Sequence, residues 1–222
     1  MRKLMSSLFV AGVVVAGSCW AQEAPAPAPE RPLTRAGARP GGEPMTPERM
    51  AQMRAERERM MQERNVMSWK NEFQRMLPLL GHRNWILVVD KAYPWQSGNG
   101  ITTLYTGLPL MKTLEEVVGA LKTSTHAAPI FYTDKEMSFM TEDMAKGVDA
   151  YREQLKKTLE GMNTQAILHN DVFPKLDEAA KLFNILVLKT DETLAYSSVF
   201  IELDCSYWGP EKEKVLREKM KK

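Results

Sequence analysis

The sequence predicts an α/β protein in which a central, mainly parallel β-sheet lies between two layers of helices. Short apolar runs of strand length alternate along the chain with longer amphipathic segments. The strongest run, Trp85 to Val89, is continuously apolar, as expected of a strand that is covered on both faces. Strands separated by helices favour a three-layer α/β/α architecture. The chain is 44% hydrophobic and 26% charged, which is ordinary for a protein with a buried core.

The elements follow from the positions of these runs. The predicted strands are residues 85–90, 101–105, 130–132, 166–168, 185–188 and 199–203. Thr113 is expected to cap a helix over residues 114–122, and Thr141 to cap a longer helix that ends near Met162. Residues 170–183 are predicted to be helical around Pro174, and a basic C-terminal helix is expected to start at residues 209–211.

The first 21 residues have the pattern of a secretory signal. Arg2 and Lys3 precede a mostly apolar run over residues 4–16, and cleavage is expected after Ala21. A lipoprotein cut at Cys19 is the alternative, but the usual Leu is missing from the first position of that motif. We therefore expect an exported protein, periplasmic or secreted. No other stretch is long and apolar enough to span a bilayer.

Residues 22–46 form a Pro/Ala-rich segment whose composition predicts a disordered tether. An Arg/Met-rich helical extension is predicted over residues 47–69. Thr46 is its expected N-cap, Pro47 suits its first position, and the pattern runs to about Arg64 with a continuation toward Met76. Its apolar stripe consists of Met50, Met53, Met60 and Met67 at heptad spacing, interrupted by Arg57 and Arg64. We interpret the stripe as a packing surface for the chain's own domain or a neighbouring subunit; a thioether site for copper is the alternative.

Several classes of function are disfavoured. Thirty Lys and Arg against 28 Asp and Glu give a net charge of +2, so neither nucleic acid nor an acidic membrane is an expected partner. The three histidines show no metal-binding spacing, and no nucleotide-binding or nucleophile-elbow motif is present. Removal of Cys19 with the signal leaves Cys205 alone, so we expect no intramolecular disulfide.

Polar residues gather at the ends of the predicted strands. Asp90 closes the strongest strand, His82 lies just before it, His169 ends another strand, and Tyr196 lies in the link to the last one. Ligands of α/β folds bind at the carboxyl ends of parallel strands. An imidazole with a carboxylate and a phenol suits proton transfer on a hydroxyl-rich substrate near neutral pH.

Each of these residues also has a structural interpretation. His82 could cap the end of the preceding helix, and Asp90 could cap a turn ahead of Pro94. His169 could flank the N-cap of the next helix, and Tyr196 could be a buried aromatic residue. Taken singly, these interpretations are favoured over the functional ones.

Four motifs, kept in order, change that balance. The first is Leu80-Gly81-His82-Arg83-Asn84 followed by the strand and by Asp90-Lys91-Ala92-Tyr93-Pro94; the others are Gly107-Leu108-Pro109, His169-Asn170-Asp171-Val172-Phe173, and the stretch from Leu188 to Val199. Together they resemble the motifs of the D-ribose pyranase and L-fucose mutarotase (RbsD/FucU-like) family. The resemblance spans about residues 70–204, leaving residues 205–222 as a basic C-terminal extension.

The resemblance implies an RbsD-like fold and a monosaccharide isomerase that interconverts anomers or ring forms without a cofactor. His82 would be the catalytic acid/base, and Asp90, His169 and Tyr196 would bind the sugar. Ser198 stands where the family has Asn and would take that place in the binding set. The family also implies a homo-oligomeric ring, a pentamer or a decamer of stacked rings, with sites completed between subunits.

Two departures from the family pattern favour an alternative. Ser198 lacks the amide of the family's Asn, and Asp191 replaces a Gly in the last motif. A non-catalytic sugar-binding or assembly protein on the same fold is therefore the second hypothesis. A Met-rich metal-handling protein is the third.

Overall fold

The computed structural model describes residues 46–221. The predicted signal sequence, its two candidate cleavage positions and nearly all of the predicted tether lie outside the described residues. Within residues 46–221 no helix is long and apolar enough to cross a membrane.

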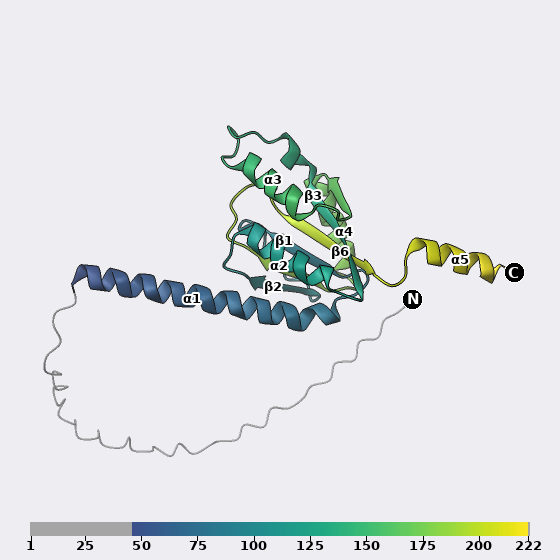
Figure 1. Ribbon diagram of the computed structural model, residues 1–222, viewed down its shortest axis with the longest axis horizontal. Helices are drawn as coiled ribbons and strands as arrows, with labels where there is room; N and C mark the ends of the chain where they lie inside the picture. Colours follow the sequence, from purple (N-terminus) through teal and green to yellow (C-terminus); the bar gives the residue numbers. More distant parts are fainter. Residues whose placement is uncertain (1–45, 222) are drawn as a thin grey trace, which may run out of the picture. The chain divides into compact units, whose positions relative to one another are not determined.

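A six-stranded sheet with helices on both faces forms the body of the described chain (Figure 1). Its strands are β1 Trp85–Val89, β2 Ile101–Tyr105, β3 Ala127–Asp134, β4 Thr164–Ile167, β5 Ile185–Lys189 and β6 Val199–Cys205. The helices are α1 Pro47–Met76, α2 Leu110–Lys122, α3 Val148–Thr158, α4 His169–Ala179 and α5 Pro210–Met220, with short 3-10 turns at Leu77–Leu79 and Lys135–Phe139.

The strand order is β2-β5-β1-β6-β3-β4. β1 pairs in parallel with β5, β5 with β2, and β3 with β4, whereas β6 is antiparallel to both of its neighbours. The sheet is therefore mainly parallel, and all strands except β6 end at the same edge. This confirms the predicted fold class.

Successive side chains of a strand point to opposite faces of the sheet, so the core has two parts, one on each face. On one face, Ile86 and Val88 of β1 pack with α2, α3 and the C-terminal part of α1. On the other face, Trp85, Leu87 and Val89 pack against α4. All five residues of β1 are buried because helices cover both of its faces, as its continuous apolar sequence predicts.

The long helix α1 starts where the sequence predicts. The Thr46 side chain accepts a hydrogen bond from the Arg49 amide, and Pro47 occupies the first turn. The helix then continues unbroken to Met76, across the predicted limit of the extension at residue 69. Its buried residues, Trp69 and Phe73, both lie near its C-terminal end.

Two predicted N-caps are wrong. α2 begins at Leu110, and Thr113 lies inside it, buried, where its hydroxyl donates to Thr106 Oγ1 at 3.2 Å. The segment after Thr141 forms turns, and α3 begins only at Val148 because Gly147 adopts a left-handed φ of 91°. The Glu142 carboxylate supplies the cap there, accepting from the amides of Gly147 and Asp149.

The link between β5 and β6 explains why β6 runs antiparallel. Residues 190–198 contain no helix, and a parallel crossover needs a dozen or more residues. The chain therefore turns back at once and carries the link over the end of β1. Thr190 Oγ1 donates to the carbonyl of Val89 at 2.7 Å, and the buried Tyr151 hydroxyl of α3 donates to the carbonyl of Ser197 at 2.6 Å.

The Tyr151 anchor gives a test of this arrangement. Tyr151→Phe leaves the Ser197 carbonyl buried without its donor, so we expect a loss of about 1–3 kcal/mol in the free energy of unfolding by urea. Tyr105→Phe is the matched control. Its hydroxyl donates to Asp191 on an exposed surface, and its removal should cost less than about 0.5 kcal/mol. Equal losses in the two variants would contradict the anchoring role.

Candidate functional site

One edge of the sheet collects most of the candidate residues. Asp90 follows β1, Ser198 precedes the antiparallel β6, and His169 follows β4 through Leu168. β3 ends at the same edge with Asp134. The strand polarities therefore bring together residues from four separate segments of the chain.

Asp90 and Ser198 are bonded to each other across this edge. The Ser198 hydroxyl donates to Asp90 Oδ2 at 3.2 Å and lies 3.1 Å from the Asp90 amide, which donates to it. Asp90 Oδ1 accepts from the amides of Ala92 and Tyr93 at 2.8 and 2.9 Å. Asp90 thus caps the turn before Pro94, as its structural interpretation predicts, and keeps acceptor capacity on Oδ2 for a ligand.

His169 is held by two acidic residues. Its Nδ1 lies 2.9 Å from Asp134 Oδ2, and its backbone amide donates to both carboxylate oxygens of Glu136 at 3.0 Å. The Asp134 carboxylate accepts the Nδ1 proton when it is ionised, which leaves the Nε2 lone pair of the ring for a substrate. His169 is the first residue of α4; Glu136 holds its backbone amide and Asp134 holds its ring.

Tyr196 lies edge-on to the imidazole of His169, with ring centroids 5.4 Å apart and planes at 87°. Its residue is 38% exposed, so it is not the buried aromatic of the structural interpretation. Its backbone has a left-handed φ of 58°. Such a conformation is strained for a bulky residue and persists only where the surroundings enforce it. Here the anchored link between β5 and β6 fixes Tyr196 beside His169.

Asp90, His169 and Tyr196 line a common cavity of about 570 Å³, which we call the β1 cavity. Its size is within the range of small-molecule sites. The remaining lining residues are Lys91, Ala92, Thr193, Leu194 and Ala195. Ser198 does not line the cavity and contributes through its bonds to Asp90.

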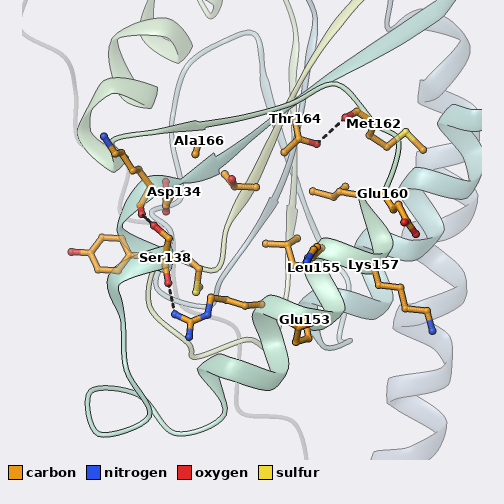
Figure 2. Close-up of a pocket in the computed structure, with 16 residues that line it drawn as sticks. Asp134, Ser138, Glu153, Leu155, Lys157, Glu160, Met162, Thr164 and Ala166 are labelled. Atoms are coloured by element: carbon orange, nitrogen blue, oxygen red, sulfur yellow. Dashed lines mark hydrogen bonds between the residues drawn. The ribbon is translucent and has the colours of Figure 1, made fainter.

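A larger cavity of about 780 Å³ lies between α3 and the end of β3 (Figure 2). Asp134 and Ser138 stand at one end of it, and Lys157 and Glu160 at the other (Figure 2). Tyr196 borders both cavities. We assign the candidate site to the smaller β1 cavity because it unites an imidazole, a carboxylate and a phenol.

His82 lies at the opposite edge of the sheet from the β1 cavity of its own chain. It precedes β1, whereas Asp90 follows it, and the five residues of β1 span about 16 Å. The His82 side chain is 54% exposed, and its Nδ1 lies 2.7 Å from Asp204 Oδ1 at the end of β6. The Nε2 atom accepts from Arg83 Nε at 3.2 Å. His82 bonds a carboxylate here and does not cap the preceding helix.

Asp134 and Glu136 are functional candidates that the predicted elements did not indicate. The predicted strand over residues 130–132 was too short to mark Asp134 as a strand end. The observed β3 reaches Asp134, so the rule that singled out Asp90 would have found it. Glu136 carries no comparable signal, because its contact with the His169 amide depends on the turn over Lys135–Phe139.

Burial dominates the electrostatics of the Asp134–His169 pair. It raises the pKa of Asp134 to about 6, although the hydrogen bond from His169 acts in the opposite direction. Asp134 Oδ1 has no hydrogen-bond partner within residues 46–221. Among the same residues, no three His, Cys, Asp or Glu side chains are placed to hold a metal ion together.

No protein-family model and no curated protein matches the chain. Solved structures are similar to it. RbsD of Bacillus subtilis, complexed with D-ribose, is 15% identical with a TM-score of 0.44, and the match covers 60% of this chain and 91% of RbsD. FucU from Bifidobacterium longum is 14% identical, with a TM-score of 0.42 over 60% of this chain and 94% of FucU.

The fucose mutarotase of Streptococcus pneumoniae, in complex with L-fucose, is 16% identical with a TM-score of 0.41, over 60% of this chain and 91% of that protein.

The raised pKa of Asp134 predicts a pH-dependent stability. Between its usual pKa near 4 and about 6, Asp134 holds a proton in the folded state that it loses on unfolding. The free energy of unfolding should therefore fall as the pH rises through this window. Asp134→Asn cannot ionise and should lack this contribution. Urea unfolding of both proteins from pH 4 to pH 8 measures the difference, and parallel curves would contradict the assigned burial.

Proposed function

We propose that the chain is a cofactor-independent monosaccharide mutarotase or pyranase-like isomerase. The observation that carries the proposal is the meeting of Asp90, His169 and Tyr196 around one cavity at the carboxyl edge of the sheet. These three residues come from separate motifs of the sequence, and each motif resembles the corresponding one of the ribose pyranase and fucose mutarotase family.

The reaction needs only proton transfers. One proton is delivered to the ring oxygen and one is removed from the anomeric hydroxyl, so that the ring opens to the aldehyde, rotates and closes. An imidazole titrates near neutral pH and serves both directions. His169 keeps Nε2 for a proton of the sugar because Asp134 holds its Nδ1, while Asp90 Oδ2 and the Tyr196 hydroxyl are suited to hold sugar hydroxyls.

His82 enters this proposal from a second copy of the chain. Within one chain the sheet separates it from the β1 cavity, but its side chain is exposed and held by Asp204. The proposed assembly is a homo-oligomeric ring in which the His82 edge of one copy completes the cavity of its neighbour. His82 of the second copy is the proposed catalytic acid/base. Arg83, which donates to His82 Nε2, must then move aside to free that atom for proton transfer with the sugar. The proposal also includes export of this assembly.

Anomer exchange measured by saturation-transfer NMR tests the activity. We expect the full chain to accelerate exchange of at least one sugar among ribose, fucose, galactose and related monosaccharides. His82→Ala and His169→Ala should each lower the rate at least about a hundredfold, because each removes a proton-transfer group. Tyr196→Phe should weaken sugar binding, whereas Tyr105→Phe, which removes a phenol hydroxyl outside the cavity, should not. Wild-type rates in both histidine variants would contradict the mechanism.

Mixing the two histidine variants tests whether the site is shared. In a co-expressed oligomer of His82→Ala and His169→Ala chains, about a quarter of the sites combine the intact His169 of one copy with the intact His82 of another. We expect about that fraction of wild-type activity to return. A site built within one chain would regain none.

A non-catalytic sugar-binding protein is the second candidate, and the Asp90–Ser198 pair favours it. The Ser198 hydroxyl is engaged with Asp90, so it does not replace the amide that the family presents to sugar. Asp191, at the family's Gly, is tied to Lys91 and to the Tyr105 hydroxyl. Sugar binding that is lost in Tyr196→Phe, together with unaccelerated exchange of every sugar in the panel, would establish this second function.

A further inference from the structure

The first part of α1 carries an apolar stripe that nothing covers within the described residues. Its members are 40 to 61% exposed, although methionine is a residue that normally packs. They are Met50, Met53, Met60 and Met67, and Met61 beside them is exposed as well. In Figure 1 this part of α1 extends beyond the sheet. The buried residues of the helix, Trp69 and Phe73, are near its C-terminal end.

The stripe lies on the side of α1 that faces away from the domain. Trp69 and Gln62 define the inner side, because Trp69 is buried and Gln62 Nε2 donates to the Gly107 carbonyl at 3.2 Å. Met60 precedes Trp69 by nine residues, which is about two and a half helical turns and places it on the opposite side. The domain therefore leaves the stripe accessible to a partner.

The stripe has the period of a coiled-coil seam. Met53, Met60 and Met67 occupy one of the two core positions of three successive heptads, and Met50, Arg57 and Arg64 occupy the other. Each of these two arginines directly follows a glutamate, Glu56 or Glu63, at the flanking g position. The Glu-Arg dipeptide thus repeats after seven residues.

We propose that residues 47–67 of α1 pair with the same residues of a second copy of this chain as a parallel, in-register, two-stranded coiled coil. In such a coil, a core a position packs beside the preceding g position of the partner helix. Each Arg at 57 and 64 then lies beside Glu56 or Glu63 of the second copy. The two charges that interrupt the methionine seam are neutralised in this register.

The charge pattern favours a second copy over an unrelated partner. The same sequence supplies both the arginines and the acids. A two-fold axis along the seam therefore places Arg57 and Arg64 of each copy beside a glutamate of the other. Glu63 lies 3.7 Å from Arg59 of its own helix. This ion pair is exposed and contributes little to stability, so Glu63 can bond to Arg64 of the second copy instead. Arg49 faces Arg54 of the second copy in the first heptad, so the stabilising part of the seam starts at Glu56.

Disulfide trapping tests the pairing and its direction. In the full chain with Cys19 and Cys205 replaced by serine, Met53→Cys and Met67→Cys are each made alone and oxidised. A parallel, in-register coil brings like positions together, so we expect each variant to form a covalent dimer of doubled mass on a denaturing gel. Gln52→Cys and Arg59→Cys lie off the seam on the same exposed helix and should stay monomeric on that gel.

Three results would overturn the proposal. They are no dimer from either seam variant, equal dimer from the control positions, or dimer only when Met53→Cys and Met67→Cys are mixed, which indicates an antiparallel pair. Glu56→Lys with Glu63→Lys should abolish the trapped dimer, whereas Glu48→Lys with Glu58→Lys makes the same charge change off the seam and should preserve it. Circular dichroism confirms that each variant stays folded. The result is independent of sugar chemistry.

Discussion

The brevity of the link between β5 and β6 is the constraint on which the candidate site depends. Nine residues are too few for a crossover helix, so β6 has to run against its neighbours. The link therefore crosses the carboxyl ends of the parallel strands. This crossing sets Ser198 beside Asp90 and forces Tyr196 into its left-handed conformation next to His169. In a parallel β6, Ser198 would lie at the opposite edge of the sheet from Asp90, a strand length away.

The hydrophobic pattern predicts the architecture well because a strand that is buried on both faces needs apolar residues at every position. The continuous apolar run of β1 and the alternation of strands with amphipathic segments are two such patterns. Helix starts are harder to predict. Thr113 and Thr141 have the side chains of N-caps, but Pro109 and Gly147 determine where α2 and α3 begin through their backbone conformations.

The site is only partly readable from the sequence because proximity along the chain differs from proximity in space. His82 and Asp90 are close in sequence, yet an extended strand places them at opposite edges of the sheet. Asp134 and His169 are far apart in sequence, yet the carboxylate of Asp134 lies 2.9 Å from the imidazole of His169. Strand polarity decides both outcomes, and polarity is a property of the connections between strands that no local motif expresses.

The position of Asp134 couples the two cavities. It lines the larger cavity with a carboxylate whose other oxygen orients His169, the imidazole of the smaller one. A hydrogen-bond donor that reached Oδ1 would stabilise the ionised carboxylate and lower its pKa. Thermodynamic linkage is reciprocal. Loss of the Asp134 proton would therefore strengthen the binding of that donor by the same free energy. The proton balance of the acid–imidazole pair therefore depends on Oδ1, the one oxygen of Asp134 that residues 46–221 leave without a hydrogen bond.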